Sequence, residues 1–240
     1  MANFNDWMLI FTIYSFLGWV METVFASINE RKLINRGFLT GFFCPIYGFG
    51  AVLILQSTKW VSNSLGNTFT VLIINILFAI VLVTALEFIT GFLLEKIFDC
   101  KWWDYSSHAL NIHGYICPQY SLLWGLLAFL LLKVVHPVVS GVVFSIPESV
   151  KGYLAAFISL YFLSDTTKSI MDALGLREIV LNSSKFPINR YNETIIRHKR
   201  LFRAFPRLLI LNAGIINRDI RSILNERVDK IKVKLRSRFY

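Results

Sequence analysis

Four carboxylates stand inside long apolar runs of this sequence: Glu22, Glu87, Glu95 and Asp165. An ionisable group within a membrane segment costs at least about 2.5–3.5 kcal/mol, so each of them needs a partner or a function. Carboxylates that converge on a polar cavity open to the cytoplasm could bind a cation or the cationic group of a substrate. The alternative is internal ion pairing, for example with Arg36, that only fixes the packing of helices. We take Arg36 as the group that balances these charges or binds an anionic group.

Aromatic and polar residues cluster in and after the segment 99–117, which contains Trp102-Trp-Asp-Tyr-Ser106. We expect Trp103, Asp104 and Trp124 to join the four carboxylates and Arg36 as substrate-binding residues. Tryptophan and tyrosine are also typical of the membrane interface, and that alternative is favoured for one tryptophan of the pair. Asp104 and Asn111 could instead hold the loop through bonds from side chain to backbone.

Cys100, His108, His113 and Cys117 share this loop, which raises the question of a zinc site. Structural zinc sites usually have closely paired cysteines, and these two are far apart in sequence. We therefore predict no metal site and no cofactor.

The chain has no G-x-x-x-x-G-K-[ST], H-E-x-x-H or G-x-S-x-G motif. It therefore has no P-loop of its own. No catalytic residue is assigned, and the absence of hydrolase motifs favours a protein that is not an enzyme, although the question stays open.

The elements that would position these residues are membrane helices. Residues of the hydrophobic class make up 55% of the chain, charged residues make up 17%, and the mean hydropathy is +0.55. A span needs roughly 20 apolar residues. The start of the chain lacks a basic n-region and a cleavage site, so we expect its first apolar run to be retained. The sequence predicts an all-α polytopic bundle of about five transmembrane helices, at residues 7–28, 44–61, 69–98, 118–135 and 150–171. The fourth helix is expected to stop at His136-Pro137, and residues 138–146 are too few for a further span.

The positive charge is confined to the end of the chain. Residues 1–171 contain 9 Lys and Arg against 9 Asp and Glu, whereas residues 172–240 contain 16 against 6, which accounts for the whole net charge of +10. The sequence therefore divides into a transmembrane domain, 1–171, and a basic helical tail, 172–240. Because Lys and Arg accumulate on the cytoplasmic side, we predict a multi-pass protein with the N-terminus outside and the C-terminus in the cytoplasm.

Apolar residues recur at helical spacing between Leu208 and Leu235, with basic residues between them. This pattern predicts a basic amphipathic helix. Three partners remain open for it: anionic lipid, an acidic protein partner, or the underside of its own membrane domain. Nucleic acid is not expected, because aromatic residues are not interleaved with the charges.

A series of motifs in the first half of the chain resembles one bacterial membrane protein family. The motifs are Phe16-Leu-Gly-Trp19 with Glu22, Asn35-Arg-Gly-Phe38, Cys44-Pro-Ile-Tyr-Gly-Phe-Gly50, Glu87-x-x-Thr-Gly91 with Glu95, Trp102-Trp-Asp-Tyr-Ser106, Gly114-x-Ile-Cys117 and Ser121-Leu-x-Trp-Gly125. Their order and spacing resemble the family catalogued as putative ABC-transporter type IV, the CmpB-like integral membrane proteins. The resemblance covers about residues 10–130 by motif. It implies a permease-like subunit of a transporter in the bacterial cell membrane. Since the chain has no P-loop, it also implies a separate ATPase subunit.

The sequence is thus most consistent with the membrane component of a transporter, with the bilayer and an ATPase as partners and a homo-oligomer as a further possibility. Two alternatives stay open. Paired carboxylates near an interface could serve a membrane-embedded enzyme that modifies lipids. The chain could also be a non-catalytic adaptor that acts through its basic tail.

Overall fold

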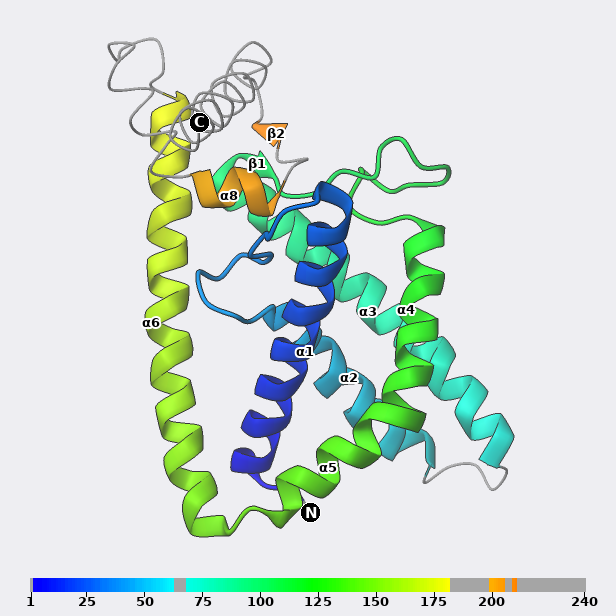
Figure 1. Ribbon diagram of the computed structural model, residues 1–240. Coiled ribbons are helices and arrows are strands. Elements are labelled where there is room, and N and C mark those ends of the chain that lie inside the picture. Colours follow the sequence, from blue (N-terminus) through cyan, green and yellow to red (C-terminus); the bar gives the residue numbers. More distant parts are fainter. Residues whose placement is uncertain (1, 63–67, 182–198, 206–208, 211–240) are drawn as a thin grey trace, which may run out of the picture.

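The protein is a bundle of long helices, as a computed structural model of residues 2–62, 68–181, 199–205 and 209–210 shows (Figure 1). The helices are α1 (Phe4–Glu30), α2 (Pro45–Ser62), α3 (Thr68–Phe98), α4 (Pro118–Leu130), α5 (His136–Ser145), α6 (Glu148–Leu181) and the short α8 (Lys199–Ala204). Strands β1 (Cys100–Lys101) and β2 (Leu209–Ile210) form one small antiparallel pair. The predicted all-α bundle is confirmed.

In the part of the chain that the structure describes, three helical segments are long and apolar enough to cross a membrane: Phe4–Ile28, Phe69–Phe98 and Pro118–Ser145. Large apolar side chains lie exposed on the outside of the bundle, for example Val81, Phe157 and Leu163. Such surfaces suit a lipid environment. The protein is therefore a membrane protein, and five spans remain the prediction from sequence.

The predicted end of the fourth helix at His136-Pro137 is wrong. After α4 the chain forms a π-helical segment, η1 (Leu131–Val135), and continues as α5 to Ser145. Proline lacks the N–H that an α-helix needs and its ring crowds the preceding turn. The wider π turn directly before Pro137 accommodates it, with the His136 N–H bonded to the Leu131 carbonyl. Residues 138–145 are thus the last part of the span that begins at Pro118.

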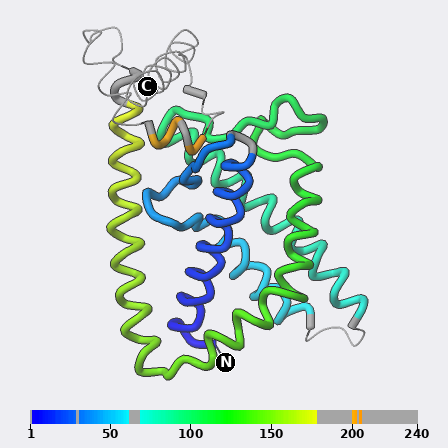
Figure 2. The backbone as a smooth tube through the Cα atoms, in the orientation of Figure 1, coloured from blue at the N-terminus to red at the C-terminus, as the bar shows by residue number. Residues whose placement is uncertain are grey.

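The two ends of the bundle carry different elements, as Figures 1 and 2 show. At the upper end of Figure 1 lie the C-terminal ends of α1, α3 and α6, the loop 99–117, β1 and α8. At the lower end lie the start of α1 and the turn from α5 to α6. The chain returns from the upper end through an irregular segment, residues 31–44, so α2 begins only partway down the bundle. We keep the terms upper end and lower end below.

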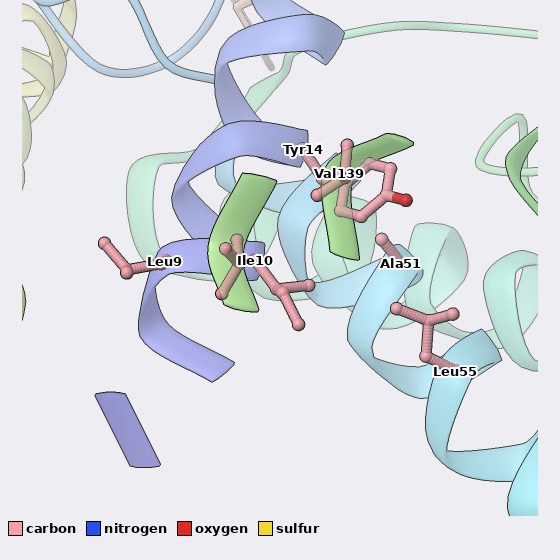
Figure 3. Packing of buried hydrophobic residues seen from close by; sticks show 7 residues of the cluster. Leu9, Ile10, Tyr14, Ala51, Leu55 and Val139 are labelled. Carbon is pink, nitrogen blue, oxygen red and sulfur yellow. The ribbon is translucent and has the colours of Figure 1, made fainter. Parts of the chain in front are cut away.

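The core between α1, α2 and α5 is apolar (Figure 3). Leu9, Ile10 and Tyr14 of α1 pack against Ala51 and Leu55 of α2, and Val139 of α5 completes the cluster.

Only the start of the predicted basic tail is described, and it packs against the upper end. α6 passes the predicted boundary at residue 171 and ends at Leu181. Leu201 of α8 is buried against Phe98 and Trp102. The Arg200 guanidinium donates to the carbonyls of Gly37, Phe38 and Leu39 at 2.8–3.3 Å. Apart from β2, the predicted amphipathic helix between residues 208 and 235 lies outside the described residues.

Candidate functional site

Glu87 is a buried carboxylate on α3, and only 4% of its surface is exposed. Its two oxygens accept hydrogen bonds from different parts of the chain. The Trp124 indole N–H of α4 donates to Oε2 at 2.9 Å, and the Tyr105 hydroxyl of the loop 99–117 donates to Oε1 at 3.1 Å. Within the described residues, no Lys, Arg or His forms an ion pair with Glu87.

Glu22, near the upper end of α1, is held in a different way. Its Oε1 accepts a hydrogen bond from the Tyr47 hydroxyl at 2.6 Å, and its Oε2 lies 3.4 Å from Arg36 Nε. That guanidinium also donates to the Ala204 carbonyl and lies over the Phe205 ring at 5.6 Å. The charge of Glu22 is therefore balanced by Arg36 within the protein.

The rings of Tyr47 and Trp124 connect the two carboxylates. They meet edge to face with centroids 5.5 Å apart. Gly18 of α1 makes this possible, since a Cβ there would overlap the Tyr47 ring. Glu22, Tyr47, Trp124, Glu87 and Tyr105 thus form a continuous carboxylate–aromatic network with residues from α1, α2, α4, α3 and the loop.

Tyr105 completes the network from the loop and is stacked on Tyr120 at 4.5 Å. Burial and the neighbouring Glu87 carboxylate raise the pKa of Tyr105 well above its ordinary value. The hydroxyl therefore stays protonated at physiological pH and serves as a donor to Glu87.

A cavity of about 200 Å³ adjoins the network. Tyr47, Trp124 and Tyr14 form part of its wall, and the rest is apolar, from α1, α2, α3, α4 and η1. A ligand in this cavity would meet the rings of Tyr47 and Trp124, whose polar atoms already bind the two carboxylates.

Asp165 of α6 lies apart from this network and binds backbone. Its Oδ1 accepts from the Thr40 N–H at 3.0 Å and its Oδ2 from the Gly41 N–H at 2.9 Å. Ser169, one turn later, also accepts from the Thr40 N–H at 3.0 Å. Asp165 thereby accepts hydrogen bonds from two backbone N–H groups of the irregular segment 31–44 and attaches α6 to this segment.

Glu95 and Trp103 belong to the contact between α3 and the loop. The Trp103 indole donates to the Tyr115 carbonyl at 2.8 Å. Gly91 leaves room for the Trp103 and Tyr115 rings, since a Cβ there would lie 3.0 Å from each of them. One oxygen of Glu95, Oε2, is buried without a hydrogen-bond partner within the described residues.

Asp104 holds the loop together, as its alternative role predicted. Its Oδ1 accepts from the backbone N–H of Ser106 at 3.1 Å and lies 3.9 Å from Lys101 Nζ. Asn111 bonds the carbonyls of Ser106 and His108 and the N–H of Gly114. The predicted bonds from these two side chains to the backbone are confirmed.

The three cysteines are free and buried. In the described ranges, no group of three or more His, Cys, Asp or Glu residues could hold a metal ion. His108 bonds Gln119 at 3.1 Å, and His113 stacks on Tyr115.

The structure therefore brings Glu22, Arg36, Glu87 and Trp124 into one place and leaves Asp165, Glu95, Trp103 and Asp104 around it. The role of Tyr47 was not predicted, and Tyr105 was interpreted only as an interfacial residue. A usable signal for Tyr47 was its position between Pro45 and Gly48, where the chain enters α2.

Comparison with known proteins identifies one family. The family model described as putative ABC-transporter type IV matches residues 9–170, which is more than half of the 240-residue chain. Searches among curated proteins and among solved structures gave no match.

Proposed function

Because the chain belongs to the putative ABC-transporter type IV family, we propose that it is the membrane component of a transporter. In this proposal the carboxylate–aromatic network binds the cationic group of a substrate, and the upper end of the bundle faces the cytoplasm. The apolar cavity beside Tyr47 and Trp124 receives the rest of the molecule.

The proposal rests on one observation, which is that Glu87 is buried without a positively charged partner among the described residues. This carboxylate is nearly fully buried, and its protein partners are two neutral donors. A buried carboxylate is costly unless a cation, a proton or several hydrogen bonds stabilise it. A substrate amine or guanidinium at the cavity would supply that charge, and the Trp124 and Tyr47 rings would add cation–π attraction.

Arg36 supports the same interpretation. It pairs with Glu22 and leaves Glu87 as the carboxylate of the network that has no cation among the described residues. A single cationic group would then complete the charge balance of the network. The site would favour a monovalent organic cation over a neutral ligand of the same shape.

The first test replaces Glu87→Gln, which keeps the shape of the side chain and removes its charge. We expect transport to be lost while the amount of protein in the membrane stays unchanged, because Gln can still accept one of the two hydrogen bonds. A panel of amines and guanidines, screened by thermal unfolding of the purified protein, should contain compounds that stabilise the wild type and not the variant, since a ligand stabilises only the state it binds.

Glu148→Gln is the matched control, because Glu148 lies at the lower end with its side chain 59% exposed. This variant should transport and bind as the wild type does. Wild-type transport in Glu87→Gln would remove Glu87 from the site.

The second test concerns the partner. The segments 31–44 and 99–117 and α8 form the surface at the upper end where an ATPase would dock. Purification of the tagged protein in mild detergent should retain a P-loop ATPase in stoichiometric amount. Recovery of this chain alone, or as a homo-oligomer, would contradict the ATPase-driven form of the proposal.

A further inference from the structure

A second and larger cavity, of about 710 Å³, lies toward the lower end and shares no lining residue with the first. Residues of α1, α2, α3, η1 and α5 surround it. Ile10 and Leu55, which Figure 3 shows at the contact of α1 with α2, form part of its apolar wall. The carboxylate–aromatic network makes no use of this cavity.

Three strongly apolar segments each place a rare polar residue at this cavity. Lys59 is the single charged residue of α2, and Lys133 is the single charged residue between Pro118 and Ser145. Asn75 is the single side-chain amide of α3. Charged residues within apolar spans are costly and mark binding sites or ion paths. Their meeting at one cavity, from three different segments, indicates a common ligand.

Asn75 shows that the cavity is built for a polar ligand. Its side chain is 95% buried, since 5% of its surface is exposed, and its Oδ1 has no hydrogen-bond partner within the described residues. An unpaired buried amide costs about 1–3 kcal/mol. A ligand hydroxyl that donates a hydrogen bond to Oδ1 would remove this cost.

The charge at the cavity is positive. Its lining contains Lys59 and Lys133 and, among the described residues, no carboxylate. Asp6 and Glu148 at the lower end already have a cationic partner, because Lys151 lies 2.6 Å from Asp6 and 3.5 Å from Glu148. Lys59 lies over the Trp7 ring at 4.6 Å, and neither Lys59 nor Lys133 has an ion pair among the described residues.

Lys133 belongs to the π segment of the span. It is the central residue of η1 (Leu131–Val135), and it lines the cavity. Such turns are rare and are frequently found at functional sites.

We propose that this cavity binds a ligand that carries a phosphate group, with the phosphate held between Lys59 and Lys133 and a hydroxyl of the ligand donating a hydrogen bond to Asn75 Oδ1. A phosphate on a lipid headgroup fits best, because the apolar residues Leu72, Leu132 and Phe144 line the same cavity and could contact acyl chains. Free phosphate has the same recognition chemistry without the chains.

The experiment measures ligand retention by native mass spectrometry on the full-length protein in mild detergent. The three probes are dioctanoyl phosphatidylglycerol, dioctanoylglycerol and inorganic phosphate. The wild type should bind phosphatidylglycerol more tightly than dioctanoylglycerol, which has the same chains and no phosphate. Lys59→Gln and Lys133→Gln should each weaken phosphatidylglycerol binding by about fivefold, which corresponds to about 1 kcal/mol for one basic residue near an anionic group.

Lys96→Gln is the matched control, because Lys96 is an exposed lysine near the upper end of α3. It should leave the dissociation constant within about twofold, and Lys133→Arg should restore binding because it restores the charge. If Lys133→Gln does not fold, as judged by thermal unfolding, the exposed Lys59 still supplies the test.

The three probes also separate the source of the phosphate. Tight binding of phosphatidylglycerol alone identifies a lipid site, and equal binding of inorganic phosphate identifies a site for the free anion. The proposal is overturned if dioctanoylglycerol binds as tightly as phosphatidylglycerol, or if Lys96→Gln weakens binding as much as the two cavity variants do.

Discussion

At the residue scale, the two carboxylates of the network differ in the groups that balance their negative charge. Glu22 has Arg36 beside it, whereas Glu87 receives hydrogen bonds from Trp124 and Tyr105 that carry no full charge. Among the described residues, Glu87 therefore has no positively charged partner. Either a bound cation or a bound proton would balance the charge of Glu87. Exchange of one for the other would couple ligand binding to the protonation of this carboxylate.

Cys100 gives a prediction at the same scale. It lies just beyond the end of α3, and burial, followed by the charge of Asp99, raises its pKa from 9.0 to about 12. At pH 8 its thiolate fraction should be about a thousandfold below that of a thiol with the ordinary value, at tenfold per pKa unit. In a variant that retains only Cys100, maleimide should label the folded protein very slowly and the unfolded protein within minutes.

The sign of the linked stability follows from the raised pKa. The protonated thiol of Cys100 stabilises the folded protein relative to the unfolded chain. This stabilisation is fully present below about pH 9 and is lost as the pH rises toward about 12. Rapid labelling of Cys100 in the folded protein at pH 8 would contradict its burial.

At the scale of elements, the irregular segment 31–44 is the part of the bundle that most needs support. Backbone that is not helical survives at membrane depth only when protein or water satisfies its polar groups. Here α6 supplies that support through Asp165 and Ser169, which accept the N–H groups of Thr40 and Gly41. α6 and the segment 31–44 should therefore be stable only together.

Gly41→Ala tests this contact. A Cβ at position 41 would overlap the Tyr161 hydroxyl and lie 2.8 Å from Asp165 Oδ2. Because the neighbours would have to move, we expect a loss of about 1–3 kcal/mol in the free energy of unfolding. Thermal unfolding in detergent, followed by circular dichroism, measures the change.

Gly141→Ala is the control for this experiment, since a Cβ there meets nothing within 4 Å. It should leave the midpoint temperature unchanged or raise it, because Ala favours the helix over Gly. Equal destabilisation by the two substitutions would mean that the close contact at Gly41 is unimportant.

Most elements of the bundle could be predicted from hydropathy, and the exceptions have physical reasons. The predicted fourth helix ended at His136-Pro137 because proline usually stops a helix. A π turn absorbs the proline here, and no local sequence signal distinguishes the two outcomes. The irregular chain before α2 fits the glycines and the single proline, Pro45, between Gly37 and Gly50, since these residues disfavour a continuous helix.

The charged residues of the site could be predicted from the sequence, whereas the contacts between its side chains were harder to predict. Glu22 and Glu87 stand out because ionisable groups are costly in apolar runs, and Trp124 belongs to the aromatic cluster in and after the segment 99–117. Tyr105 does not stand out, since a tyrosine near a membrane interface is common, and Tyr47 is marked only by its position between Pro45 and Gly48. Their roles depend on contacts across 25 and 18 residues of sequence, which hydropathy does not encode.

At the scale of the whole molecule, the carboxylate–aromatic network and the larger cavity lie toward opposite ends and contain charged groups of opposite sign. The network with Glu22 and Glu87 lies toward the upper end, and the cavity with Lys59 and Lys133 toward the lower end. A membrane protein with charged groups of opposite sign toward its two ends can interact differently with the two sides of the bilayer. Its orientation therefore matters for both proposals.

The orientation can be measured with single cysteines at opposite ends. Ser107 lies exposed in the loop 99–117, and Ser149 lies exposed at the start of α6. If the upper end faces the cytoplasm, an impermeant maleimide added to intact cells should label Ser149→Cys. Ser107→Cys should be labelled only after the cells are permeabilised, and the reverse pattern would overturn the predicted orientation.

The two polar attachments of α6 have a consequence for how the protein is made. Lys151 and Asp165 would each cost at least about 2.5–3.5 kcal/mol if α6 entered the bilayer alone. Their partners, Asp6 at one attachment and the Thr40 and Gly41 amides at the other, belong to segments that the ribosome completes more than 100 residues earlier. As the predicted fifth span, α6 should therefore be inserted by docking onto α1 and the segment 31–44 after these are already in place. A chain truncated before α6 would leave Asp6 and the Thr40 and Gly41 amides without these partners.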